Sequence, residues 1–289
     1  PYKGPVLAML AYGNLAGREY ADLDFALPQR YIPEAIAALQ TAGFRSLFDR
    51  GEAHAGENGF APGQYTFLSA KPAEMLVELH TERTLRYYPT PVDFHDLMSR
   101  LIRVEIAGQS LCTFSVEDTL VMLSVHGAKH FWERLFWILD IARLIGVRPV
   151  DWPLLYDVAA RMECTRLLLL GLSLAHDLFG APLPDSVLQD VRGDKQVRLL
   201  AEDVLGRFAG IPGPGSGVWP RTVFRVRSRD KFLQGLSHTM RLGMSPTESD
   251  RQNVRLPRFL APLYMLLRPW RLFREYGLGS KPRPERARK

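Results

Sequence analysis

Apolar residues recur with two different periods along this chain, and the change near residue 93 limits what it can fold into. Before that point, apolar and polar residues alternate in short runs typical of strands, at 20–27, 64–70 and 75–82. From about residue 93 onward, the apolar spacing is that of helices. This order predicts an α+β fold, in which a small mixed sheet with helices is followed by an α-helical bundle.

Capping residues mark where the expected helices begin and end. Residues 4–13 and 33–43 are expected to be short helices, because each has proline in its first turn and ends in glycine. Ser115 is expected to cap a helical run over 115–146. The strongly apolar run at 164–180 is expected to lie at the centre of the bundle.

Composition divides the chain into three parts. A sheet-containing domain is expected over 1–92 and a helical domain over 93–278, which includes a glycine- and proline-rich linker at 210–220. Residues 51–63 are also rich in glycine and are expected to form a loop or hairpin. Residues 279–289 have few side chains to bury, so a basic disordered tail is expected there.

Charge is unevenly distributed between the body of the chain and its end. The formal net charge is +6, and residues 251–289 carry eleven Lys and Arg against two Asp and Glu, or +9, which leaves −3 for the rest. Such a basic segment suits an acidic partner, RNA or a membrane surface. An apolar run needs about 20 residues to cross a bilayer, and none in this sequence is that long, so no transmembrane segment is expected.

The two cysteines, Cys112 and Cys164, show neither CxxC nor Cys/His spacing. A disulfide framework or a structural zinc site is therefore not expected. Both are interpreted as buried thiols, and the reducing cytoplasm is the expected compartment.

Acidic side chains occupy the polar positions of two expected strands. In "YADLDFAL", Asp22 and Asp24 are two residues apart, so both carboxylates project from one face while Leu23 and Phe25 face the core. Glu78 emerges in the same way from "MLVELHTE". Like charges held together are unfavourable unless a cation lies between them. If the two strands are neighbours, these three carboxylates converge on one or two divalent metals, an arrangement that suits phosphoryl or nucleotidyl transfer.

The order of these features resembles the uncharacterised nucleotidyltransferase family, which belongs to the polymerase-β-like nucleotidyltransferase superfamily. The residues that carry the resemblance are "KG" before a short helix, "YGN", an arginine, "DLDF", a helix ending in "GF", and "VELH". The later "SVEDTLVMLSVHGAKH", "FWILDIARLI" and "VDW" are similar to its helical half. The resemblance covers about residues 1–185.

The resemblance implies a nucleotidyltransferase that uses Mg²⁺, with two ions possible and Mn²⁺ as a substitute. Asp22 and Asp24 fall on the Asp-x-Asp pair and hold Mg²⁺ with a nucleoside triphosphate. Glu78 falls on the third acidic position, shares the second metal and helps to activate an acceptor hydroxyl. The reaction moves a nucleoside monophosphate to that acceptor and releases pyrophosphate. The acceptor is a small-molecule hydroxyl, a protein side chain or an RNA end.

The phosphate-binding part departs from the superfamily pattern. Lys3-Gly4-Pro5 stands where Gly-Ser or Gly-Gly is usual, and proline offers no N–H to a phosphate. Free N–H groups at the start of the helix still favour an anion, and Lys3 supplies a point charge. Arg18 and Lys129 are further candidates for phosphate contact. The strand expected to lead into Lys3 is missing from this sequence, which opens at Pro1.

For three histidines and one aspartate, the sequence also allows a structural role in place of a direct functional one. His80 shares the face of Glu78 and is interpreted as a neighbour that orients it. His126 and His130 have metal-capable spacing but no third ligand, so they are assigned to a polar helix face turned towards the acidic site. Asp140, inside an apolar helix, is expected to form a buried ion pair with Arg143 or Arg134.

Two alternatives to the transferase stay open on the sequence alone. One is a non-catalytic module that keeps the fold and recruits partners through its helical half. The other is an RNA or membrane-surface binder that depends on the basic residues 251–289, whose affinity would fall steeply with salt.

Overall fold

The computed structural model describes residues 1–47, 64–70, 75–81, 93–210 and 218–244, together with Leu263, Leu267 and Trp270. Two compact units are present, residues 1–201 and residues 202–289. The loop expected over 51–63 and the tail expected over 279–289 lie outside the described residues, as does most of the linker expected at 210–220. Residues 82–92, beside the expected domain boundary at 92/93, also lie outside them, and that boundary stays a prediction.

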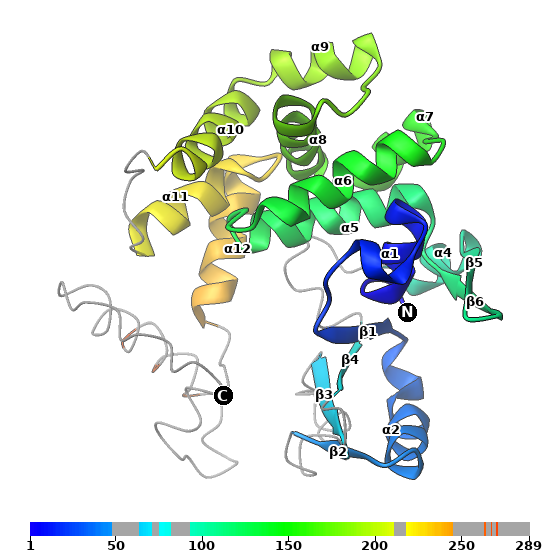
Figure 1. The fold of residues 1–289 in the computed structure, drawn as a ribbon. Coiled ribbons are helices and arrows are strands. Elements are labelled where there is room, and N and C mark those ends of the chain that lie inside the picture. Colours follow the sequence, from blue (N-terminus) through cyan, green and yellow to red (C-terminus); the bar gives the residue numbers. More distant parts are fainter. Residues whose placement is uncertain are drawn as a thin grey trace. The chain divides into compact units, whose positions relative to one another are not determined.

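A four-stranded mixed sheet forms the first part of unit 1. Its strands are β1 (Asp22–Ala26), β2 (Phe44–Ser46), β3 (Gln64–Ser69) and β4 (Leu76–His80), in the order β1-β4-β3-β2 (Figure 1). β1 pairs with β4 in parallel, while β3 pairs antiparallel with both β4 and β2. Helices cover most of the remaining described chain, so the predicted α+β fold class is confirmed.

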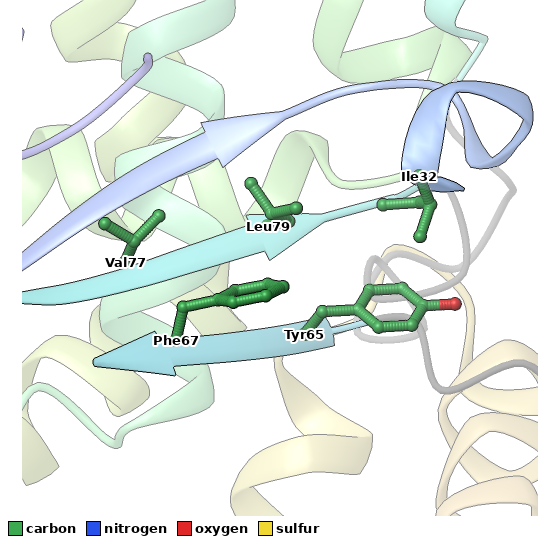
Figure 2. Close-up of a cluster of buried hydrophobic side chains, with 5 residues drawn as sticks. All are labelled: Ile32, Tyr65, Phe67, Val77 and Leu79. Atoms are coloured by element: carbon green, nitrogen blue, oxygen red, sulfur yellow. The ribbon is translucent and has the colours of Figure 1, made fainter. Parts of the chain in front are cut away.

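One face of this sheet is apolar and packs on α2 (Ile32–Thr41). Figure 2 shows the buried cluster, in which Tyr65 and Phe67 of β3 and Val77 and Leu79 of β4 lie beside Ile32. Leu23 and Phe25 of β1 pack against the same cluster, as expected from their alternation. The intervening residues of β1 and β4 therefore project from the opposite face, where the acidic side chains lie.

Helix α1 (Pro5–Tyr12) begins where the chain passes close to β1. Tyr2 donates a backbone hydrogen bond to the carbonyl of Asp24, and Gly4 then turns the chain with φ +55°. A Cβ on Gly4 would stand 3.0 Å from the backbone oxygen of Asp22. Both the left-handed backbone and the close approach therefore require glycine at this position. The helix ends at Gly13, which also has a left-handed conformation.

A two-stranded hairpin interrupts the part of the chain that was expected to be helical throughout. Helix α4 (Phe94–Ser99) is followed by β5 (Ile102–Ile106) and β6 (Gln109–Thr113), which pair antiparallel. Their two-residue turn, Ala107-Gly108, has positive φ at both positions, as hairpin turns of the primed types require. Cys112 is exposed on β6, so the expectation that both cysteines are buried was wrong for Cys112.

Helices form the remainder of unit 1. They are α5 (Val116–Lys129), α6 (Leu135–Val147), α7 (Trp152–Arg161), α8 (Thr165–Phe179), α9 (Asp185–Gly193) and α10 (Lys195–Phe208), of which the last crosses into unit 2. Ser115 caps α5 by accepting from the Asp118 N–H, as predicted. The helical run expected over 115–146 is nevertheless two helices, because the chain leaves helical geometry at Phe131 and Trp132, which have positive φ.

Helix α8 lies at the centre of this bundle, as its apolar sequence predicted. It contacts α5, α6, α7 and α9, and nine consecutive residues, 167–175, are buried. A Cβ on Gly171 would stand 2.5 Å from Ser124 Oγ of α5, so the two helices cross where a side chain on α8 has no room. This packing fixes the position of α5 in the bundle.

Unit 2 contains α11 (Val218–Arg227) and α12 (Phe232–Met244), which pack against each other. Residues 218–220, assigned to the linker from sequence, belong to α11. Gly235 of α12 lies against the backbone of Val226, where a Cβ would stand 2.6 Å from the carbonyl oxygen. Among the described residues, no helix combines the length and the apolar character needed to span a membrane.

Candidate functional site

The parallel pairing of β1 and β4 brings the acidic residues of two distant sequence segments together. Asp24 is the cross-strand partner of Glu78, and Asp22 is the partner of Leu76. Asp22, Asp24, Glu78 and His80 alternate with apolar residues, so they share the face of the sheet opposite α2. The sheet therefore meets the condition on which the sequence argument depended, that the two strands are neighbours.

Among the carboxylates of Asp22, Asp24 and Glu78, that of Asp24 is the most enclosed, with only 4% of the residue's surface exposed. Its Oδ1 lies 2.7 Å from His80 Nε2, and its Oδ2 lies 3.7 Å from Lys3 Nζ. A buried carboxylate is unfavourable without such partners. Lys3, expected to contact phosphate, is thus placed at the acidic site, and its ammonium also lies 4.9 Å from the centre of the Tyr2 ring.

His80 contacts a carboxylate on each of the two strands, Asp24 of β1 and Glu78 of β4, rather than Glu78 alone. Its Nε2 lies 3.4 Å from Glu78 Oε2, farther than from Asp24. Its ring is nearly perpendicular to that of Tyr2, with 5.6 Å between the centroids. Glu78 is held separately by Gln64 of β3, whose Nε2 donates to Glu78 Oε2 at 2.7 Å. Sequence reasoning missed Gln64, although its alternation with Tyr65 and Phe67 places it on the polar face.

The charges at this site shift three pKa values. Burial raises the pKa of Asp22, and the carboxylates of Asp24 and Glu78 raise it further. For Asp24 burial acts in the same direction, but the hydrogen bond with His80 and the charge of Lys3 outweigh it, so its pKa is lowered. For His80 burial lowers the pKa, but hydrogen bonds with Asp24 and Glu78 outweigh it and the pKa is raised. The cluster thus favours a positive charge at its centre.

The donor set fits a divalent cation. Asp24, Glu78 and His80 each present one ligand atom, and these atoms lie within 4.8 Å of one another. An all-oxygen site would match Mg²⁺ or Mn²⁺ more closely than two carboxylate oxygens and one imidazole nitrogen. Both carboxylates are nevertheless ligands that these ions prefer. Asp22 lies outside this set of three, although the charges of Asp24 and Glu78 act on it. Its role as a metal ligand stays a prediction.

Gly4 and the start of α1 lie beside these carboxylates. Pro5 is the first residue of α1, and no side chain caps the helix N-terminus. The N–H groups of Val6 and Leu7 therefore lack intrahelical acceptors. Because Lys3 contacts Asp24 and Gly4 contacts the backbone of Asp22, this helix end approaches the acidic face.

Lys129 lies at the C-terminal end of α5, in a group of aromatic and cationic side chains. His126, His130 and Trp137 have ring centroids 4.8 to 5.3 Å apart. Burial lowers the pKa of His130 to about 4, and the charges of Lys129 and Lys3 act in the same direction. Burial also lowers the pKa of His126, on which the charges of Lys3, Lys129 and Arg18 act. This end of α5 is therefore within electrostatic reach of Lys3, and a contact of Lys129 with phosphate stays a prediction.

Arg18 lies in the segment before β1 and pairs with Asp140 of α6. Its Nε lies 2.9 and 3.1 Å from the two oxygens of Asp140, and Tyr12 donates to Asp140 Oδ1 at 2.8 Å. The prediction that Asp140 pairs with Arg143 or Arg134 was wrong, because both guanidinium groups lie over aromatic rings instead. Local spacing pointed to residues on the same helix, whereas the partner comes from a distant part of the sequence.

Comparison with known proteins agrees with this geometry. The model of the family described as "Uncharacterised nucleotidyltransferase" matches residues 1–180. The match includes the acidic strands, the start of α1 and the helix that carries Asp140. No curated protein matches the chain.

Proposed function

The chain belongs to the uncharacterised nucleotidyltransferase family, and from that membership we propose that it is a metal-dependent nucleotidyltransferase. In this proposal it moves a nucleoside monophosphate from a nucleoside triphosphate to a hydroxyl acceptor and releases pyrophosphate. The acceptor is a small molecule, a protein side chain or an RNA end.

The observation that carries the proposal is the pairing of Asp24 with Glu78 across parallel strands, with His80 Nε2 2.7 Å from one and 3.4 Å from the other. Carboxylates this close favour a cation between them, and the only basic side chains that contact them among the described residues are His80 and Lys3. A site that stabilises positive charge between two carboxylates suits a divalent metal.

Asp24, Glu78 and His80, with Asp22 beside them, are the residues that would hold Mg²⁺. Bound there, the metal would neutralise phosphate charge and align the acceptor oxygen with the leaving group. Glu78 takes the proton of the acceptor hydroxyl at a carboxylate oxygen. The hydroxyl oxygen forms a bond to the α-phosphorus, and the bond from that phosphorus to the β-phosphate bridging oxygen breaks.

Lys3, Arg18, Lys129 and the N–H groups that follow Gly4 are assigned to the triphosphate. A triphosphate brings several negative charges beside carboxylates, so cationic groups are needed to offset the repulsion. Lys3 contacts Asp24 directly, and the charge of Arg18 acts on both Asp22 and Asp24. Gln64 keeps Glu78 Oε2 in place.

The test is transfer of label from each of the four nucleoside triphosphates, labelled at the α-phosphate, in Mg²⁺. Candidate acceptors are the protein itself, an RNA pool and a small-molecule extract, each analysed for a covalent mass shift. We expect label on at least one acceptor with the wild type and none with Asp24→Asn. Nucleotide binding without transfer to any acceptor would favour a non-catalytic module, and absence of nucleotide binding would overturn the proposal.

A further inference from the structure

Asp140 is a completely buried carboxylate to which the proposed reaction gives no role. It lies on α6 with none of its surface exposed, and the run "FWILDIARLI" around it is otherwise apolar apart from Arg143. Two side chains from other parts of unit 1 reach it, Arg18 from the segment before β1 and Tyr12 from the end of α1. A buried charge of this kind is unfavourable unless it is fully paired.

We propose that Asp140 is a positioning residue that holds the guanidinium of Arg18 in the direction of the bound triphosphate. This inference rests on the proposed function, because it assigns Arg18 to the phosphates of a nucleotide. It adds that the helical half of unit 1 takes part in nucleotide binding through α6. Asp140 itself touches no substrate.

The contacts of Arg18 fix one edge of the guanidinium and leave another available. Nε donates to both oxygens of Asp140, at 2.9 and 3.1 Å, and Nη1 donates to the backbone oxygen of Glu19 at 3.3 Å. Among the described residues, Nη2 has no hydrogen-bond partner. The planar guanidinium can therefore bind Asp140 through Nε and still present Nη2 to a phosphate oxygen.

The position of Arg18 agrees with a phosphate contact. Its charge opposes the raised pKa of Asp22 and adds a minor contribution to the lowered pKa of Asp24, so the guanidinium lies within electrostatic reach of both carboxylates. Only 10% of its side chain is exposed, and its Cζ lies 5.6 Å from the centre of the Phe136 ring. A long side chain that is already fixed loses less conformational freedom on binding than a solvated one.

Tyr12 and Asp140 together keep Arg18 from turning away. The Tyr12 hydroxyl donates to the same Asp140 oxygen that accepts from Arg18 at 3.1 Å, so Asp140 is held by α1 while it holds Arg18. The triphosphate-binding groups that follow Gly4 also belong to α1. Asp140 and its two partners thus link the segment before β1, α1 and α6 in one network of charge-assisted hydrogen bonds.

A purely structural ion pair is the competing explanation, and a double-mutant cycle separates the two. The probe is inorganic tripolyphosphate with MgCl₂, titrated calorimetrically, because it tests phosphate contact without a choice of base. The proteins are wild type, Asp140→Asn, Arg18→Gln and the double variant. The control is Asp194→Asn, since Asp194 forms a similar pair with Arg166 Nε at 2.9 Å and asparagine keeps its capping role.

We expect Asp140→Asn and Arg18→Gln each to weaken tripolyphosphate binding by about tenfold or more, and the double variant to be no weaker than Arg18→Gln alone. Asp194→Asn should bind as the wild type does. Arg18→Lys keeps the charge but lacks the planar guanidinium, which can hold Asp140 through Nε and offer Nη2 to phosphate, so it should bind nearly as weakly as Arg18→Gln. This variant also tests the inference if Asp140→Asn fails to fold, which a thermal melt would reveal.

Three results overturn the inference and leave the proposed function intact. The first is a folded Asp140→Asn protein that binds tripolyphosphate as the wild type does. The second is a double variant whose losses add, and the third is full rescue of binding by Arg18→Lys. If the wild type binds neither tripolyphosphate nor any nucleoside triphosphate with Mg²⁺, the proposed function fails, and this inference fails with it.

Discussion

Asp24 of β1 and Glu78 of β4 are direct cross-strand partners in a parallel pair, and His80, two residues after Glu78, contacts both. Residues two apart on each strand share one face, and the register places the two sets of polar side chains side by side. The apolar residues between them form the face that packs on α2. One register therefore sets both the core of the sheet and the carboxylate cluster.

The contact from Gln64 to Glu78 predicts a kinetic effect. Gln64→Leu removes the donor 2.7 Å from Glu78 Oε2, so Glu78 loses its fixed orientation while the metal ligands remain. We expect kcat of nucleotidyl transfer to fall by about five- to fiftyfold, with a smaller change in KM. Gln109→Leu, on the exposed start of β6, is the control. An unchanged kcat for Gln64→Leu would show that this hydrogen bond has no part in the reaction.

The histidine in the cluster predicts that metal affinity depends on pH. The folded pKa of His80 lies above its ordinary value of 6.5, because its hydrogen bonds with Asp24 and Glu78 outweigh the opposing effect of burial. The protonated ring opposes a cation, so metal affinity should rise with pH, by up to about tenfold per unit, until the folded pKa is passed. Calorimetric titration with MnCl₂ from about pH 6 to 9 measures this.

His80→Gln is the matched variant for that experiment. Glutamine cannot take up a proton in this range, so the rise in affinity with pH should be much smaller than in the wild type. The same slope in both proteins would mean that another group controls the pH dependence.

The alternation of residues 20–27 and 75–82 allowed the acidic face and the apolar face of the sheet to be predicted. The parallel pairing of β1 with β4 was only a condition of that argument, because alternation gives each strand's faces but not its neighbour. The hairpin over 102–113 was missed, since it is short and lies between helices. Its alternation and the Ala107-Gly108 turn were the available signals.

The partners of buried charges were the least predictable part of the site. Helical spacing suggested Arg143 and Arg134 for Asp140, but the pair that forms joins Asp140 to Arg18 across unit 1. Such a contact depends on how α1 packs on α6, which no local pattern encodes. Gln64 was missed for a related reason, because an amide in a strand becomes informative only when its carboxylate neighbour is known.

The pKa of His130 predicts how stability changes in acid. Its folded pKa is about 4, well below its ordinary value of 6.5, because of burial and the charges of Lys129, Lys3 and Arg134. The unfolded chain takes up a proton on this residue before the folded protein does. Its contribution to stability is therefore complete above about pH 6.5 and is lost as the pH falls towards 4.

Urea unfolding of His130→Gln and wild type between those pH values checks this expectation. The free energy of unfolding should fall less steeply in the variant as the pH drops. His95→Gln, an exposed substitution on α4, should follow the wild type. Parallel curves for wild type and His130→Gln would contradict the assignment.

The close approach of Gly4 to β1 predicts a stability cost that has two separable parts. Gly4→Ala places a Cβ 3.0 Å from the Asp22 carbonyl at a residue with φ +55°, and should destabilise the protein by about 1–3 kcal/mol. Gly43→Ala has positive φ but no neighbour within 4 Å, so it reports the backbone strain alone. We expect the Gly4 variant to lose more in chemical denaturation. Equal losses would mean that the contact with β1 relaxes freely.

The metal site itself is tested most directly by electron paramagnetic resonance of Mn²⁺ titrated into the wild type, Asp24→Asn and Glu78→Gln. Asp157→Asn is the control, because the Asp157 side chain is exposed on α7. We predict that the wild type and the control remove free Mn²⁺ from solution, that the affinity falls at least about 100-fold in each cluster variant, and that all four proteins melt as folded proteins. Equal Mn²⁺ binding by the wild type and folded Asp24→Asn would contradict the assignment of this strand pair as the metal centre.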